Sequence, residues 1–284
     1  MLINWYYYSS KFEYENKFLG LDRPWSGHKY FVYDLIRNIK PKIIVELGSE
    51  RGVSFFSMCQ AVKDGDLNIK LYAIDTWAGD KHSGFYSENT YKNFVKYKNK
   101  YYSELDIEIL RMFFDEAVSK FKNSSIDLLH IDGLHTHEAV KHDYETWLDK
   151  VKPSGTILFH DTVERGRGFG IYKLWDSLKL KNNSIEFTHS HGLGVLIKDQ
   201  KLFLEIKKLE AIWQRYYSTL YDYNLFRSFH YDSSEMKKRK KMEDKIKRLE
   251  DKIKEYEKIL GTITSAKTFR IWQSYCRFRD SIFK

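Results

Sequence analysis

A regular alternation of apolar runs with segments of helical period between residues 43 and 161 constrains the fold more than any other feature of the sequence. The apolar runs have the length of strands and occupy residues 43–47, 70–75, 107–112, 126–132 and 155–161. Strands that alternate with helices pair in parallel, and the helices cover both faces of their sheet. The sequence therefore predicts a doubly wound α/β domain with a mainly parallel sheet.

Segments on either side of this alternation complete the predicted domain. A helix is predicted before the first strand, from Ser26 to Lys40, and another after the last, from Lys201 to Leu220. Apolar runs within residues 185–199 have the character of a hairpin, so we expect them to close one edge of the sheet. The domain is thus expected to span residues 25–220, after an N-terminal lead of residues 1–24.

The C-terminal part predicts a helical extension. Residues 221–234 are polar and aromatic and predict a linker, and residues 235–263 predict a short coiled coil. Its apolar seam alternates spacings of four and three and consists of Met242, Ile246, Leu249, Ile253, Tyr256, Leu260 and Ile263. This pattern favours a parallel dimer and hence a homo-oligomer. Because only about three heptads are present, a single helix that packs back on its own domain is the alternative.

The last segment, residues 264–284, predicts a basic amphipathic helix. It mixes aromatic side chains with lysines and arginines, as in Phe269, Trp272, Arg277 and Arg279. Such a helix suits the headgroup region of an anionic membrane, and docking onto a partner protein is the alternative. Much of the formal net charge of +9 lies in this segment and in residues 237–258. No nucleic-acid-binding module is visible, so we do not expect a nucleic-acid partner.

Cysteine content and hydropathy bear on the compartment. Cys59 and Cys276 are far apart in the sequence and form no metal-binding or disulfide pattern. No run of about 18 apolar residues and no signal-peptide pattern is present. We therefore expect a cytoplasmic protein, with the tail as a peripheral contact to the inner face of the cytoplasmic membrane.

The turn after the first predicted strand, Glu46 to Gly52, reads ELGSERG. It lacks the glycine spacing of a dinucleotide fingerprint and the lysine of a Walker loop. Gly48 and Gly52 would let the backbone approach a ligand, and Glu46 would balance a positive charge. Asp75 ends the next strand, where its carboxylate can accept both hydroxyls of a ribose. The pattern indicates a neutral or cationic nucleoside rather than a phosphate.

Several further motifs carry a family resemblance. They are Glu46-Leu47-Gly48, Asp75-Thr76-Trp77, Gly79-Asp80 with His82, Ile126 to His135, Val140, Asp143, Trp147, Ser154 to Thr162, and Gly168 to Trp175. Together they resemble the class I S-adenosylmethionine-dependent methyltransferases. The resemblance is to the bacterial group related to macrocin-type sugar O-methyltransferases and cephalosporin-hydroxylase-like proteins, and it covers about Trp25 to Lys198.

The resemblance implies a Rossmann-like methyltransferase fold with S-adenosylmethionine as cofactor and a sugar or surface glycan as acceptor. It also implies the residues of the cofactor site. The methionine end would be lined by Glu46, Gly48, Ser49, Gly52 and Ser54, the ribose would be held by Asp75, and the adenine would lie near Trp77 and Asp115. For Asp115, an ordinary role at the start of a helix is the alternative.

A polar cluster is predicted where two neighbouring strands end. Asp132 and Asp161 end these strands, so their carboxylates can converge at the carboxyl edge of the sheet. Carboxylates brought close together repel unless a proton or a cation lies between them. We expect Mg²⁺ or another divalent cation here, bound by Asp132, His160 and Asp161. The sequence departs from the family pattern at Leu134, where some sugar methyltransferases have a second aspartate.

Methyl transfer to a hydroxyl needs a group that removes the proton. His135 follows Asp132 closely in the loop before a helix and is the first candidate, with Asp132 beside it. His82, after the second strand, is the rival. Two other functions stay open: a hydroxylase-type enzyme on the same fold, and a non-catalytic scaffold whose working part is the coiled coil.

Overall fold

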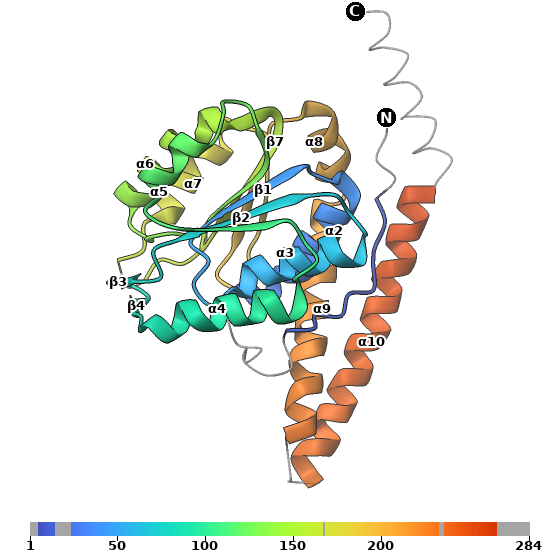
Figure 1. Ribbon diagram of the computed structural model, residues 1–284. Helices are drawn as coiled ribbons and strands as arrows, with labels where there is room; N and C mark the ends of the chain where they lie inside the picture. Colours follow the sequence, from blue (N-terminus) through green and yellow to red (C-terminus); the bar gives the residue numbers. More distant parts are fainter. Residues whose placement is uncertain (1–4, 15–23, 167, 233–235, 266–284) are drawn as a thin grey trace, which may run out of the picture. The chain divides into compact units, whose positions relative to one another are not determined.

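The computed structural model describes residues 5–14, 24–166, 168–232 and 236–265, drawn with their element labels in Figure 1. The chain divides into two compact units. One comprises residues 8–210, and the other comprises residues 1–7 with residues 211–284. The unit of residues 8–210 thus includes part of the predicted N-terminal lead, where Phe12 and Tyr14 are buried, and it ends ten residues before the predicted boundary at residue 220.

The first unit is built on a seven-stranded sheet with the order β5-β2-β1-β6-β7-β9-β8. The strands are β1 (Ile43–Leu47), β2 (Lys70–Asp75), β5 (Ile107–Arg111), β6 (Ile126–Ile131), β7 (Val151–His160), β8 (Ser184–Phe187) and β9 (Leu193–Ile197). β1, β2, β5, β6 and β7 pair in parallel, while β9 is antiparallel to both β7 and β8. The predicted mainly parallel sheet and its closing hairpin are confirmed. A small pair, β3 (Gly79–Asp80) with β4 (Gly84–Phe85), stands apart from this sheet.

Helices cover both faces of the sheet (Figure 1). On one side lie α2 (Lys29–Ile39), α3 (Val53–Asp64) and α4 (Glu88–Tyr101), and on the other lie α5 (Phe114–Ala117), α6 (His137–Trp147) and α7 (Ile171–Lys179). Short 3-10 turns lie at Pro24–Gly27, Val118–Lys120 and Leu148–Lys150. The sheet contributes Val45, Leu129 and Phe159 to the core on the α6 and α7 side, where Trp147 and Trp175 pack against them. Burial on both faces explains why the strands read as continuous apolar runs.

The predicted helix from Lys201 to Leu220 is interrupted. It forms α8 (Gln200–Lys207) and the start of α9 (Glu210–Asp232). Asp199 caps α8, since its side chain accepts hydrogen bonds from the backbone N–H groups of Lys201 and Leu202.

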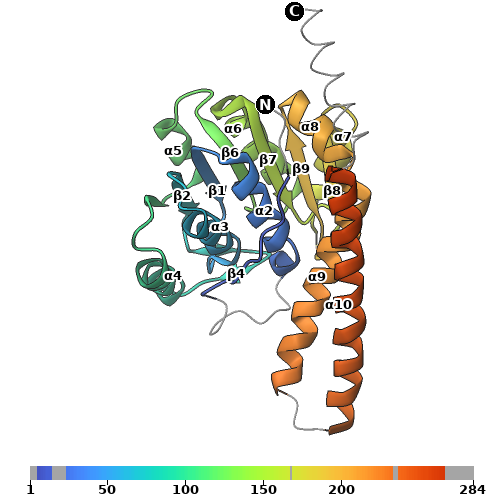
Figure 2. The same ribbon diagram turned by 90° about the vertical axis from the view of Figure 1, so that its right-hand side faces the viewer.

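The second unit contains most of α9 together with α10 (Met236–Ser265), which run antiparallel to each other (Figure 2). The prediction of a linker at residues 221–234 was wrong as far as Asp232. This stretch contains neither glycine nor proline, so nothing in it stops the helix. The hydroxyl of Tyr223 donates a hydrogen bond of 3.2 Å to the carboxylate of Glu250 and joins the two helices.

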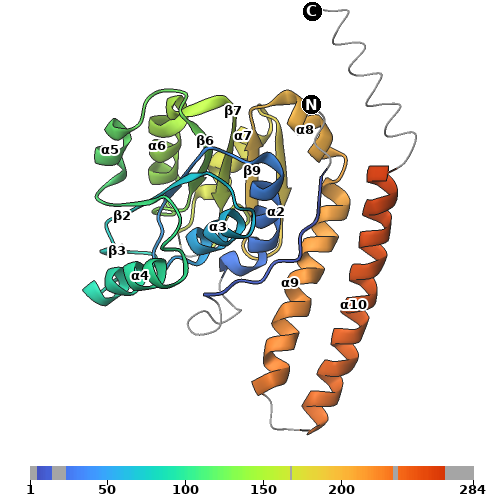
Figure 3. The ribbon, with the colours of Figure 1, turned by 45° about the vertical axis from the view of Figure 1, so that its right-hand side comes forward.

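α10 covers the predicted coiled-coil segment and continues through Gly261 to Ser265 (Figure 3). α10 pairs with α9 within the second unit. The coiled coil, the parallel dimer and the alternative of a helix that packs back on its own domain stay predictions. The predicted basic helix of residues 264–284 lies outside the described residues beyond Ser265. Among the helices that the structure describes, none has the length and apolar character needed to cross a membrane.

Asp127 joins the starting ends of three strands. Its Oδ2 accepts hydrogen bonds from the backbone N–H groups of Lys42 (3.0 Å) and Ile43 (2.9 Å), and its Oδ1 accepts one from the Lys152 ammonium group (2.7 Å). This carboxylate therefore fixes the start of β1 against β6 and β7, at the end of the sheet opposite to the predicted site.

We expect Asp127→Ala to lower the free energy of unfolding by about 1–3 kcal/mol, because two backbone donors lose their acceptor. Asp127→Asn is the matched control. Its amide oxygen can still accept both backbone bonds, and it loses only a partly exposed ion pair, for a cost of about 1 kcal/mol or less. Urea denaturation of both variants measures the difference. Equal stability of the two variants would contradict the role of the backbone bonds.

Candidate active site

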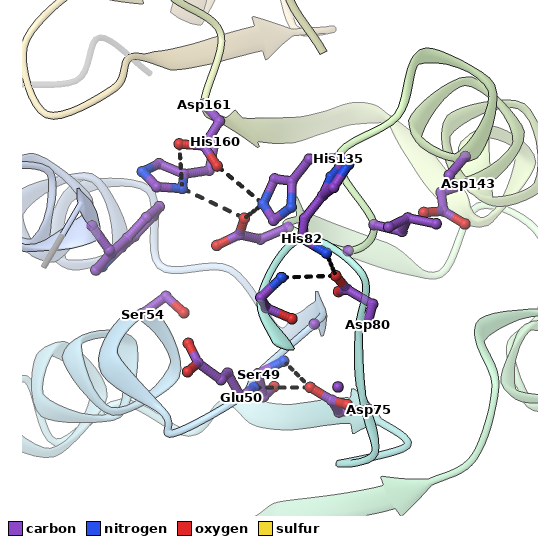
Figure 4. A pocket seen from close by; sticks show the side chains of 18 of the residues that line it. Ser49, Glu50, Ser54, Asp75, Asp80, His82, His135, Asp143, His160 and Asp161 are labelled. Carbon is purple, nitrogen blue, oxygen red and sulfur yellow. Dashed lines mark hydrogen bonds and ion pairs between the residues drawn. The ribbon is translucent and has the colours of Figure 1, made fainter. Parts of the chain in front are cut away.

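A cavity of about 590 Å³ opens at the carboxyl ends of β1, β2, β6 and β7 (Figure 4). This volume lies within the range of small-molecule sites, and ligands of open α/β sheets bind at this edge. Three parts of its wall bear on the argument: the turn after β1 with Asp75; a polar cluster of Asp132, His135, His160 and Asp161; and a mostly apolar part of Phe113, Phe114, Gly133, Leu134, Ala139 and Asp143. The segment around β3 and β4, with Asp80 and His82, also lines the cavity.

The turn after β1 packs directly against the end of β6. Gly48 has a φ of +90°, and a Cβ atom built on it would lie 2.1 Å from the carbonyl oxygen of Asp132. Only glycine fits this close approach in a left-handed conformation. Gly48, Ser49 and Ser54 line the cavity, as predicted for cofactor-binding residues. Gly52 does not line it and instead turns the chain into α3.

Asp75 holds the shape of this turn. Its Oδ2 accepts hydrogen bonds from the backbone N–H groups of Ser49 (2.9 Å) and Glu50 (2.8 Å), and its Oδ1 accepts one from that of Trp77 (2.7 Å). Burial raises the pKa of this carboxyl group, and the three backbone hydrogen bonds oppose that rise. Asp75 also lines the cavity, so its remaining lone pair can accept a hydrogen bond from a ligand.

Two predicted cofactor residues lie behind the turn and do not line the cavity. Glu46 is fully buried, accepts a hydrogen bond of 2.7 Å from the Ser49 hydroxyl and lies 2.9 Å from Nδ1 of His130. Trp77 is also buried, and its indole N–H donates to the carbonyl oxygen of Glu50. Both residues position the turn. Their places at the methionine end and near the adenine, which the resemblance implies, stay predictions.

Asp115 is not part of the cavity wall, contrary to the prediction that it lies near an adenine. Its side chain is 64% exposed and pairs with His142 at 2.8 Å, because the start of α5 turns it outward. Asp143 lines the cavity instead. The sequence does contain a signal for Asp143: it lies three residues after Val140 and four before Trp147, which places a carboxylate on the buried face of a helix.

The polar cluster brings together the side chains that were predicted at the ends of β6 and β7 (Figure 4). Nε2 of His135 lies 3.0 Å from Oδ2 of Asp161 and 3.4 Å from Oδ1 of Asp132. Nδ1 of His160 lies 3.4 Å from Oδ1 of Asp132 and 3.5 Å from Oδ1 of Asp161. Asp161 has a φ of +60°, an uncommon conformation for a residue with a side chain that is often found at functional sites.

The carboxylates of the cluster determine the charge of its histidines. Burial alone would lower the pKa of His135, but Asp132 and Asp161 prevail and raise it to about 10. Burial likewise opposes charge on His160, and the same two aspartates raise its pKa to about 9. Burial disfavours the charged form of Asp132, yet His160 and His135 hold its pKa well below the usual range. Without another cation, protonated imidazoles balance the two carboxylates.

The donor atoms of the cluster fit a divalent cation. Asp132, His135 and Asp161 each offer a ligand atom, and these atoms lie within 4.8 Å of one another. Oδ1 of Asp161 is buried and has no hydrogen-bond partner among the described residues. Carboxylate oxygens are the ligands that Mg²⁺ prefers. The predicted set of Asp132, His160 and Asp161 also converges, so two histidines compete for the third position.

The ring of Phe169 lies between His82, the rival base, and His135 of the cluster. The ring of His82 stacks on Phe169 at 5.2 Å, and Phe169 stacks on His135 at 4.5 Å between ring centroids. Burial and the nearby His135 lower the pKa of His82. His82 lines the cavity, but the aspartates of the cluster contact His135 and His160.

We predict that Asp143→Asn stabilises the protein at alkaline pH. Burial raises the pKa of Asp143 to about 7, while an unfolded aspartate has a pKa near 4. The stability from the neutral carboxyl group is therefore complete below about pH 4 and is lost as the pH rises through 7. The variant should match the wild type at pH 4 and exceed it by about 1–3 kcal/mol at pH 8 in urea denaturation. A variant less stable than the wild type at pH 8 would contradict this.

Comparison with known proteins agrees with the geometry. Residues 45–162 match a family described as a methyltransferase domain. An uncharacterised protein of Sinorhizobium fredii, y4gI, is 42% identical over 174 residues, which cover 61% of this chain and 19% of that protein. The chain thus matches about a fifth of the length of this relative.

The fold also has similarities among solved structures. The methyltransferase PaMTH1 of Podospora anserina is 15% identical, with a TM-score of 0.47, over 60% of this chain and 77% of that one. The O-methyltransferase TomG of Streptomyces achromogenes is 11% identical, with a TM-score of 0.44, over 64% and 91%. These similarities are too distant to inform function. Residues 45–162 thus match a methyltransferase domain, and the sheet that contains them has the mainly parallel, helix-flanked arrangement of a Rossmann-like fold.

Proposed function

We propose that this domain transfers the methyl group of S-adenosylmethionine to a hydroxyl group of a sugar or glycan, with assistance from a divalent cation. The observation that carries the proposal is one cavity that joins the glycine turn after β1 to the cluster of His135, Asp132 and Asp161. A cofactor held at the turn and an acceptor held at the cluster would meet within it.

The wall of the cavity suits the separate parts of the cofactor. Gly48, Ser49 and Ser54 would lie along its methionine end. Asp75 would accept a hydrogen bond from a ribose hydroxyl with the lone pair that its three backbone donors leave free. Negative charge in the cavity wall favours a ligand with a positive sulfonium group.

The reaction is an in-line displacement. The acceptor oxygen forms a bond to the methyl carbon while the carbon–sulfur bond breaks, and the electron pair of that bond goes to sulfur, which leaves S-adenosylhomocysteine. Alignment of the reacting atoms supplies much of the rate. The proton of the acceptor hydroxyl goes to Nε2 of His135, the nitrogen that faces both aspartates.

Asp132, His160 and Asp161 would hold the cation and leave His135 for proton transfer. When bound, a divalent cation supplies positive charge that lowers the pKa of a nearby hydroxyl and balances the carboxylates that otherwise keep His135 protonated. Phe169, stacked on His135, keeps this imidazole in place and shields it from water.

The acceptor class comes from the resemblance to sugar O-methyltransferases. We place the enzyme in the cytoplasm, with self-association through residues 235–263 and contact of residues 264–284 with the inner face of the membrane. Such an arrangement would keep the enzyme close to lipid-linked glycan intermediates.

We expect His135→Gln to lower kcat by about 10²–10⁴-fold, because general-base catalysis is lost. The affinity for S-adenosylhomocysteine should stay within about twofold, since His135 does not line the glycine turn. Transfer of labelled methyl groups to candidate sugars measures the rate, and calorimetry measures the affinity. His82→Gln is the matched control and should retain most of the rate. A larger loss in the His82 variant would identify His82 as the base.

Removal of divalent cations should abolish methyl transfer, and Mg²⁺ should restore it. Asp161→Asn should raise the Mg²⁺ concentration needed for half-maximal rate by about tenfold or more, since a charged ligand is lost. The full rate in excess chelator would show that the carboxylates serve another purpose.

A further inference from the structure

We propose that the carboxyl group of Asp143 recognises the adenine of the cofactor by accepting a hydrogen bond from its 6-amino group. This inference rests on the proposed function, because it assumes that the cavity holds S-adenosylmethionine. It replaces Asp115, the acidic residue to which the sequence assigned this place.

Asp143 belongs to the mostly apolar part of the cavity wall. This part also contains Phe113, Phe114, Leu134 and Ala139. Figure 4 shows Asp143 on α6, well apart from His160 and Asp161. A flat heteroaromatic base suits an apolar surface of this kind. A single carboxyl group there can discriminate between bases through the hydrogen-bonding groups along the edge of the ring.

Gly133 marks the place where this surface and the carboxyl group meet. A Cβ atom built on Gly133 would lie 2.6 Å from Cε2 of Phe114 and 3.2 Å from Oδ2 of Asp143. Glycine thus allows the aromatic ring and the carboxyl group to approach the same stretch of backbone, directly after Asp132. A larger side chain would displace one of the two.

Asp143 is 8% exposed and lines the cavity, and none of the described residues donates a hydrogen bond to its carboxyl group or forms an ion pair with it. A buried polar group without a partner is costly, and ligands commonly supply the missing partner at functional sites. The other acidic groups of the wall have partners. Asp75 holds the glycine turn, and Asp132 and Asp161 contact histidines. Asp80 accepts backbone hydrogen bonds from His82 and Ser83, and Glu50 pairs with Arg51.

The chemistry of the carboxyl group selects a 6-aminopurine. Its carbonyl oxygen accepts a hydrogen bond from an exocyclic amino group in either protonation state. Because burial raises the pKa of Asp143 to about 7, the neutral form is well populated, and its O–H can donate to N1 of adenine. A purine without the 6-amino group would leave the carboxyl group without this donor.

The experiment compares two ligands on the full-length protein by isothermal titration calorimetry. One is S-adenosylhomocysteine, and the other is the analogue whose purine has hydrogen in place of the 6-amino group. The wild type should bind S-adenosylhomocysteine about 10–100-fold more tightly, as expected for a buried hydrogen bond. Asp143→Leu should bind both ligands with nearly equal affinity, which isolates this one contact.

Two further variants control for charge and for folding. Asp143→Asn retains an acceptor oxygen and should retain the preference, although it removes the same charge as leucine does. Asp115→Asn changes the exposed aspartate of α5 and should also retain the preference. Thermal unfolding of Asp143→Leu verifies the fold, and we expect no loss of stability, because the variant removes a buried carboxyl group.

An unchanged preference in Asp143→Leu would overturn the inference, as would loss of the preference in Asp115→Asn. Either result would leave the proposed function intact, because S-adenosylhomocysteine would still bind. If the wild type bound neither ligand, the proposed function itself would fail, and the inference with it.

Discussion

The close approach of the turn after β1 to the end of β6 is the constraint on which the rest of the site depends. Gly48 lies so near the backbone of Asp132 that no side chain fits between them. The turn that would hold a cofactor therefore contacts the end of β6 directly, next to Asp132, the first carboxylate of the polar cluster. Asp75 fixes the other side of the same turn through three backbone hydrogen bonds. Parallel pairing of β1 with β2 and β6 brings these parts to one edge of the sheet.

Charge is arranged along this edge in separate regions. Asp132 and Asp161 form a concentrated negative region that histidines balance. Asp75 is occupied mainly with backbone donors, and Asp143 stands alone in apolar surroundings. The three regions thus differ in their partners, and a ligand with a cationic centre, a hydroxyl group and an amino group would complement all three. This correspondence links the fold to the proposed cofactor.

The sequence predicts the sheet and the polar cluster well, because both follow from the order of the strands. Residues at the ends of adjacent parallel strands lie close together, which is why strand order places Asp132 beside Asp161, and His135 follows Asp132 by three residues. The sequence does not show which residues near a turn face the cavity. Glu46, Trp77 and Asp115 do not line it, and the side chain of Asp115 is exposed at the start of α5. The helix at residues 221–232 was missed because its polar and aromatic composition suggested a linker.

A crystal structure of the protein with S-adenosylhomocysteine tests the central claim most directly. The account predicts that the ligand lies in the cavity with its sulfur facing Asp132, His135 and Asp161, its ribose at Asp75 and its adenine between Phe114 and Asp143. A ligand bound elsewhere, or bound in the cavity with its sulfur directed away from the cluster, would contradict it.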